Sequence, residues 1–280
     1  MNALKQLKQL VATYSTLRLG KAVDLLKHIL ATYSNLRIGV AVVALAFPLI
    51  LWFGPQLLGI KLELQPSMSA YYHTPMRNAF VGILFIVGSF LYAYRGYTLW
   101  EDKLLNVAGI LAIGIAVFPT GINCSPDDLA CLERAKLIFT SPKLHGFCAV
   151  GFFICISLVT LSFRPTLDLV QNQTTKKALT YTYIALAALM IVLPLIAAYL
   201  SYYSPENGRH VIFWVEFAAV YVFATYWMVK SFEVKETALE MMLAISEAST
   251  DVKALSKEVQ VKRAERARHA SQGKAIQLQR

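Results

Sequence analysis

The sequence predicts an all-α polytopic membrane protein, a bundle of six transmembrane helices with both chain ends in the cytoplasm. Hydrophobic residues make up 56% of the 280 residues and charged residues only 16%, whereas a soluble domain carries about 25% charged residues. The mean hydropathy is +0.50. The apolar residues also form continuous runs of the length that a membrane-crossing helix needs. This composition excludes a soluble enzyme, a disordered chain and a disulfide-dense fold.

Six apolar runs are candidates for membrane spans. Backbone groups inside a bilayer must satisfy their own hydrogen bonds, so each run is interpreted as a helix. A transmembrane barrel would show alternating segments instead. The predicted spans are 37–53, 78–97, 104–119, 144–163, 179–200 and 211–230. The third span is short, and an earlier start at Leu99 is the alternative.

The placement of lysine and arginine predicts the orientation. With the N-terminus inside, 21 of the 27 basic residues fall in the inner segments and in the chain ends. The expected location is therefore a cell inner membrane, with most of the +10 net charge facing anionic lipid. Nucleic acid is not an expected partner, because no aromatic surface for stacking bases accompanies the charge. No signal peptide precedes the first span, which is expected to stay in the mature protein.

The N-terminal region, 1–36, is expected to form cytoplasmic amphipathic helices ahead of a transmembrane domain over 37–230. Segment 8–20 reads KQLVATYSTLRLG and is repeated at 27–39 as KHILATYSNLRIG, with eight of 13 positions identical. Apolar residues at helical spacing in the first copy favour a helix that lies on the inner leaflet. The alternative is a local duplication without a separate function.

Segment 231–261 carries a heptad pattern, with apolar residues spaced alternately by four and three. They are Val234, Ala238, Met241, Ile245, Ala248, Val252, Leu255 and Val259. This pattern predicts a helix continuous with the sixth span that pairs with a second copy, giving a homodimer through 234–259. The alternative is an amphipathic helix that packs on the N-terminal helices of its own chain. The tail 262–280 is polar and basic and is expected to be disordered.

Three histidines, His73, His145 and His210, fall near the outer ends of the second, fourth and sixth spans. Thr74-Pro75 and Ser141-Pro142 are typical of helix starts, so these histidines should lie near positive helix ends, which favour neutral imidazole. Three neutral imidazoles and a water would suit catalytic zinc. The alternatives are ordinary residues of the membrane interface, or a sensing site without a metal.

Ser69, Arg77 and Glu216 lie near these histidines and complete the candidate site. An acid inside a span is costly and needs a partner, which Arg77 or a bound proton could provide. Glu216 could orient a histidine, act as a base, or lock the sixth helix to the second. The hypothesis is a metal-dependent hydrolase at the outer face. Zinc-bound water would attack an amide or ester of a lipid-like substrate while Ser69 assists the oxyanion.

The four cysteines form two pairs along the sequence. Cys124 and Cys131 lie between the third and fourth spans, and a disulfide is expected there if that loop faces an oxidising compartment. A helix starting at Ser125 would hold the two Cα atoms about 10 Å apart and prevent the bridge. Cys148 and Cys155 are seven residues apart in the fourth span and are expected to act as small hydrophobic side chains.

The motifs SxSxYYHTxxR, LHxxxAxxFF and FWxE resemble an uncharacterised family of six-span bacterial membrane proteins, over about 37–232. The resemblance marks Ser69, Tyr71, Tyr72, His73, Arg77, Glu101, Asp102, Pro119, His145, Trp214 and Glu216. More remotely, Ser69-xxx-His73 is similar to an element of the CREST-type membrane hydrolases, which include alkaline ceramidases and adiponectin-receptor-like proteins. That resemblance implies zinc-dependent hydrolysis of lipid amides. The sequence departs from it in span number, in lacking a late HxxxH pair and in the predicted side of the membrane.

A non-enzymatic protein is the second hypothesis. The six helices would sense or bind a ligand at the outer face, and the chain would oligomerise through its cytoplasmic helix. A channel or transporter is less favoured, because no span carries regularly spaced polar residues and no inverted repeat is visible.

Overall fold

The computed structural model describes residues 32–122, 129, 133, 140–168, 170, 172–203 and 210–234. Every regular element in these ranges is helical, as the composition predicts. The chain divides into two compact units, Met1–Val234 and Lys235–Arg280. The predicted first repeat at 8–20, the Cys124–Cys131 bridge, the heptad helix beyond Val234 and the tail 262–280 lie outside the described residues.

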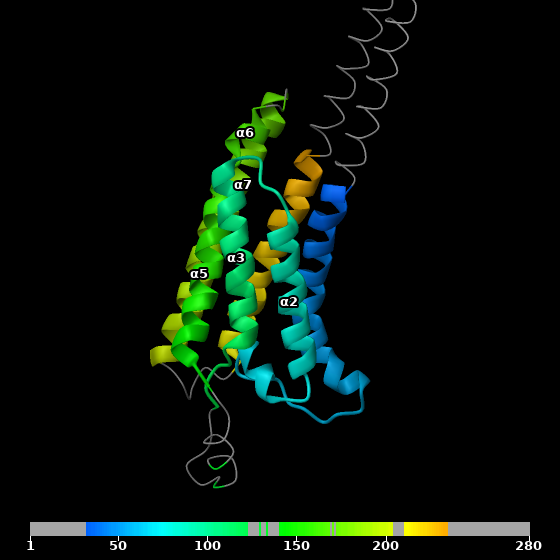
Figure 1. The fold of residues 1–280 in the computed structure, drawn as a ribbon, viewed down its shortest axis with the longest axis vertical. Coiled ribbons are helices and arrows are strands. Elements are labelled where there is room, and N and C mark those ends of the chain that lie inside the picture. Colours follow the sequence, from blue (N-terminus) through cyan, green and yellow to red (C-terminus); the bar gives the residue numbers. More distant parts are fainter. Residues whose placement is uncertain are drawn as a thin grey trace, which may run out of the picture. The chain divides into compact units, whose positions relative to one another are not determined.

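Helices of 17 residues or more form the bundle, and successive ones run in opposite directions (Figure 1). In the described ranges they are Thr32–Leu57, α2 (Arg77–Ala93), α3 (Leu99–Val117), α5 (Pro142–Leu161), α7 (Gln173–Tyr203) and Val211–Val234. A 3₁₀ helix, η1 (Ser69–His73), precedes α2, and the four-residue helix α6 (Arg164–Leu167) separates α5 from α7.

Four of these helices are long and apolar enough to cross a bilayer: Thr32–Leu57, α5, α7 and Val211–Val234. The chain therefore has the make-up of an integral membrane protein. α2 is apolar but has only 17 residues, and α3 begins with the charged residues Glu101, Asp102 and Lys103 in its first turns. For these two helices, membrane crossing stays a prediction.

The helix starts follow the local sequence only in part, and among η1, α2, α3 and α5 a side-chain cap bond forms at α3. The hydroxyl of Thr98 accepts a hydrogen bond from the Glu101 backbone N–H at 3.1 Å, so α3 begins at Leu99, the earlier of the two expected starts. Ser141 and Pro142 start α5 as predicted. The prediction that Thr74-Pro75 starts the second helix is wrong. Thr74 ends η1, and α2 begins at Arg77.

Small residues allow the central helices to approach closely. A Cβ atom built on Gly88 of α2 would lie 2.7 Å from the carbonyl oxygen of Gly109 in α3, so the two backbones touch at this point. A Cβ on Gly114 of α3 would lie 2.7 Å from the sulfur of Cys148 in α5. Within a membrane, helices associate through such close packing, because lipid tails are as apolar as the side chains.

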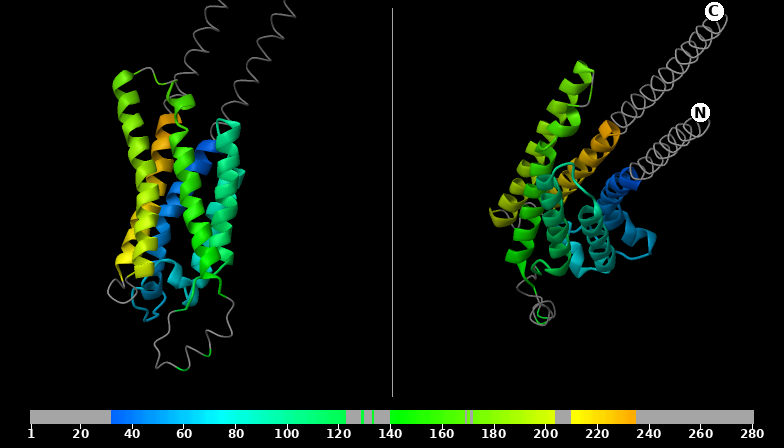
Figure 2. Two further views of the ribbon diagram at one scale, coloured as in Figure 1. Left: turned by 90° about the vertical axis from the view of Figure 1, so that its left-hand side faces the viewer. Right: turned by 45° about the horizontal axis from the view of Figure 1, so that its top comes forward.

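α7 lies on the flank of the bundle and packs along α5 (Figure 2). Only 22% of its most apolar 18-residue stretch is buried inside the protein, the smallest share among the four candidate spans. Its last turns carry the exposed tyrosines Tyr199, Tyr202 and Tyr203. An exposed apolar helix face that ends in tyrosines is typical of a helix that faces lipid and reaches the headgroup layer.

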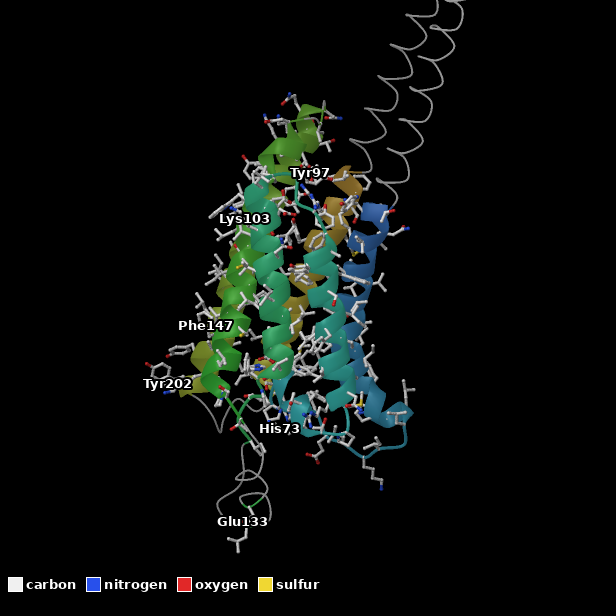
Figure 3. All side chains as sticks on the ribbon, in the orientation of Figure 1. His73, Tyr97, Lys103, Glu133, Phe147 and Tyr202 are labelled. Carbon is white, nitrogen blue, oxygen red and sulfur yellow. The ribbon has the colours of Figure 1, made fainter. Side chains whose placement is uncertain are left out.

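The bundle has two polar ends, and Figure 3 shows one of them at His73 and the opposite one at Tyr97. We call the first the histidine end, made of η1, the start of α5 and the start of helix Val211–Val234. The second is the ionic end, defined by four buried charged residues. They are Arg37, Glu101, Lys230 and Glu233.

Candidate functional site

At the histidine end, two imidazoles form hydrogen bonds to the segment that connects α3 to α5. The Nε2 atom of His73 lies 2.8 Å from the carbonyl oxygen of Thr120, and the Nδ1 atom of His145 lies 2.8 Å from that of Phe118. A carbonyl oxygen can only accept a hydrogen bond, so each of these ring nitrogens carries a proton. In the neutral rings, the lone pairs are then on Nδ1 of His73 and Nε2 of His145.

The third predicted ligand differs from the other two. His210 is exposed and directly precedes helix Val211–Val234, at the helix mouth as expected. Among the residues that the structure describes, no group of three or more His, Cys, Asp and Glu side chains could hold a metal ion. The three-histidine zinc site therefore stays a prediction, and the structure brings only His73 and His145 to a common segment.

Glu216 fastens the last helix to the segment before α2. Its Oε2 atom accepts a hydrogen bond from the backbone N–H of Met68 at 2.6 Å, and the N–H of Ser69 also donates to this carboxylate. Three residues earlier, the backbone N–H of Phe213 donates to the carbonyl of Pro66 at 3.0 Å. Of the roles predicted for Glu216, locking the sixth helix in place agrees with these contacts, and the locked element is η1 rather than α2.

Arg77 is not the partner of Glu216. Its guanidinium donates to the hydroxyl of Tyr72 at 2.7 Å and lies 4.5 Å from the centre of that ring. The Tyr72 ring in turn packs edge-on against His73, with the ring centroids 5.2 Å apart. Ser69 shares a hydrogen bond of 3.1 Å with Ser67. Arg77 thus supports the position of His73 through Tyr72, while Ser69 belongs to the η1 turn.

Tyr71 fills the space beneath this polar layer. The residue is 1% exposed, and its ring packs against Phe213 with the ring centroids 6.1 Å apart. Burial raises the pKa of the Tyr71 hydroxyl, so the group stays protonated and neutral at physiological pH. It adds no negative charge beside the histidines.

The ionic end is a second polar cluster, which the sequence motifs do not predict as a site. Lys230 and Glu233, one turn apart on the last helix, form an ion pair of 3.2 Å and are 3% and 0% exposed in their side chains. The ammonium of Lys230 also donates to the hydroxyl of Thr166 in α6 at 2.6 Å. The hydroxyl of Tyr183 in α7 donates to the carboxylate of Glu233. These contacts hold three helices together.

The other half of the ionic end comes from helix Thr32–Leu57 and the first turn of α3, with the turn between α2 and α3 packed against them. Arg37 donates to the hydroxyl of Tyr94 at 3.2 Å, and the backbone N–H of Tyr97 donates to the carboxylate of Glu101 at 3.0 Å. The Tyr97 ring lies 5.2 Å from the ammonium of Lys230, which connects the two halves.

Tyr94 and Tyr97 carry phenol groups, which ionise only near about pH 10. Both hydroxyls therefore stay neutral at physiological pH, and neither offers Arg37 a negative charge.

The sequence does contain the charged residues of the ionic end, but each of them also fits another interpretation. Arg37 and Lys230 count among the basic residues that predict the orientation, and Glu101 was marked only through a family resemblance. The better signal is the spacing of Lys230 and Glu233. Opposite charges three residues apart on an apolar helix can pair with each other inside a membrane.

Comparison with known proteins finds no matching family model, no matching curated protein and no matching solved structure. The predicted resemblances to a six-span bacterial family and to CREST-type hydrolases thus stay expectations from the sequence motifs.

Proposed function

We propose that the protein is a membrane sensor or scaffold, in which the ionic end couples the helical bundle to the two terminal segments. The observation that carries this proposal is the location of the ionic end. Arg37 lies in the second turn of helix Thr32–Leu57, and Lys230 and Glu233 lie in the last two turns of Val211–Val234. Residues 1–31 precede the first of these points, and residues 235–280 follow the second.

Buried charges make such a junction sensitive to helix position. Separating Lys230 from Glu233 would leave an uncompensated charge in a place where water is scarce, which is strongly unfavourable. The ionic end therefore favours one arrangement of α6, α7 and the last helix. A ligand or a membrane change that shifts these helices would alter the start of the segment with the heptad pattern, through which the chain is proposed to dimerise.

Crosslinking in native membranes tests this proposal. Val252→Cys, in a chain whose four native cysteines are replaced by alanine, should give a crosslinked dimer. Adding Ile245→Asp should abolish the dimer, because a charge would enter the helix seam. Lys230→Met should change the crosslinking yield several-fold, whereas Lys103→Met, on α3 near the same end, should leave it unchanged. Absence of a dimer, or equal yields for Lys230→Met and the parent chain, would contradict the proposal.

A metal-dependent hydrolase of a lipid-like substrate is the second candidate, favoured by the pair His73 and His145. Histidines that bind metals usually donate their other ring N–H to a carbonyl or carboxylate. Both imidazoles here make that type of bond to the connection between α3 and α5. Zinc would supply an activated water, and His210 or a residue outside the described ranges would have to complete the ligand set.

Metal analysis of the purified full-length protein decides this candidate. Stoichiometric zinc in the parent chain, lost in His73→Ala and in His145→Ala, would support it. His210→Ala shows whether that residue is the third ligand. Zinc content near zero in the parent chain, or equal zinc in the His73→Ala and His145→Ala variants, would remove the hydrolase from consideration and leave the sensor or scaffold function.

A further inference from the structure

Two buried hydrogen-bond donors at the ionic end have no acceptor among the described residues. They are the Nε–H of Arg37 and the Nε1–H of Trp227, on side chains that are 2% and 0% exposed as whole residues. Buried donors in folded proteins almost always have a partner, because an unmade hydrogen bond costs about 1–3 kcal/mol in desolvation. An acceptor for these two donors would have to come from outside the described protein atoms.

Both side chains pack against the same tyrosine. The guanidinium carbon of Arg37 lies 5.9 Å from the centre of the Tyr94 ring, and the Trp227 ring meets that ring edge-on with the centroids 5.1 Å apart. Arg37 belongs to the first described helix and Trp227 to the last. Tyr94 thus brings one charged and one neutral donor to the same part of the bundle.

The charges at the ionic end do not compensate Arg37 directly. Lys230 is paired with Glu233, and the carboxylate of Glu101 is held by the backbone of Tyr97. Within the ranges that the structure covers, no carboxylate lies within ion-pairing distance of Arg37, whose one hydrogen-bond acceptor is the neutral hydroxyl of Tyr94. A buried guanidinium that no carboxylate contacts is costly, so a negatively charged ligand would be favoured beside it.

We propose that Arg37 and Trp227 form a binding site for a phosphate group, either of a lipid headgroup or of free phosphate. Guanidinium groups bind phosphate oxygens through short, charge-assisted hydrogen bonds, and the indole N–H would donate one more. Arg37 is the first residue of the predicted first span, and Trp227 lies three residues before the end of the predicted sixth span, so both are near the level of the headgroups if these helices cross the bilayer. The expected cytoplasmic orientation of this end adds anionic lipid to its surroundings.

The site is independent of the proposed sensor or scaffold function, because it is tested by binding alone. The probes are inorganic phosphate, added to the full-length protein in detergent after lipid removal, and phosphatidylglycerol, added to the same preparation. Thermal unfolding measures the affinity for each probe, and native mass spectrometry counts bound lipid. Stabilisation by phosphatidylglycerol alone identifies the headgroup as the ligand, and stabilisation by phosphate alone identifies the free ion.

The deciding variant is Trp227→Phe, which removes the indole N–H and keeps an aromatic ring in the packing. We expect it to weaken binding of the active probe about tenfold or more, because a hydrogen bond to a charged group is lost. Arg37→Lys keeps the charge but removes Nε, and should weaken binding similarly. The matched controls are Trp100→Phe and Arg95→Gln, at exposed positions near the same end. Both should bind like the parent chain.

Two results would overturn the site. One is that neither probe stabilises the parent protein, in which case the donors are satisfied by ordered water alone. The other is that Trp227→Phe and Arg37→Lys bind the active probe as tightly as the parent chain does, in which case binding occurs elsewhere on the basic surface.

Discussion

Glu216 and Glu233 show how two acidic residues on one apolar helix can be stabilised in different ways. Glu216 accepts hydrogen bonds from backbone N–H groups that would otherwise be unpaired at the start of η1. Glu233 instead bonds to the side chains of Tyr183 and Lys230 on other turns and helices. The first arrangement fixes a loop, whereas the second connects helices. Glu216 is therefore expected to matter for stability rather than for proton transfer.

Substitution of Glu216 tests its structural role. Glu216→Ala leaves the N–H groups of Met68 and Ser69 without an acceptor and should lower the free energy of unfolding by about 1–3 kcal/mol. Glu216→Gln keeps one acceptor oxygen and should cost less. Denaturation in detergent measures both, with Glu63→Ala at an exposed position as the control. If Glu216→Gln were fully stable but functionally dead, a catalytic or proton-transfer role would replace the structural one.

The second repeat, at 27–39, explains which residues a helix needs in order to join this bundle. In its described part, the positions that differ from the first copy are Asn35 and Ile38, and both side chains are exposed. The shared positions include Tyr33, which packs edge-on against Tyr94, and Arg37, which donates to it. The two copies thus agree where the second copy contacts the bundle.

Converting the described part of the second copy, 32–39, to the sequence of the first should have little effect. The double variant Asn35→Thr with Ile38→Leu changes only exposed side chains and should alter the free energy of unfolding by no more than about 0.5 kcal/mol. Tyr33→Ala removes a ring contact with Tyr94 and should cost about 1–3 kcal/mol. Thermal unfolding of the purified variants measures both effects. Equal loss in the two variants would show that the exposed positions carry unrecognised contacts.

The contact between α2 and α3 depends on the absence of side chains at Gly88 and Gly109. A Cβ on Gly88 would also lie 2.8 Å from a side-chain carbon of Ile113, so Gly88→Ala must push the helices apart and should destabilise the protein by about 1–3 kcal/mol. Gly82, on the same helix, has nothing within 4 Å of its would-be Cβ. Gly82→Ala should therefore be neutral or stabilising by up to about 1 kcal/mol. Thermal unfolding of the two variants side by side measures the difference, and similar stabilities would contradict the close packing.

At the scale of the whole molecule, the hydrophobic runs predicted the helices well, because bilayer thickness and backbone hydrogen bonding leave few alternatives. Local capping predicted the start of α5 at Ser141-Pro142. It failed at Thr74, whose hydroxyl accepts from the backbone N–H of Met76 and whose N–H closes η1. The ionic end was missed because its contacts join residues far apart in sequence. Arg37 and Tyr94, for example, are separated by 57 positions.

The orientation of the whole bundle is the last prediction, and it follows from charge. With 21 of the 27 basic residues assigned to the inner side, the ionic end should face the cytoplasm and the histidine end the exterior. In a chain without native cysteines, Lys61→Cys, before η1, should react with a membrane-impermeant thiol reagent in intact cells. Arg95→Cys, in the turn between α2 and α3, should react only after the membrane is permeabilised. Both side chains are exposed on the protein surface. A difference in their labelling would therefore report the side of the membrane rather than burial within the protein. The reverse labelling pattern would invert the orientation. It would place the Arg37 site away from the anionic inner leaflet and leave free phosphate as its better-supported ligand.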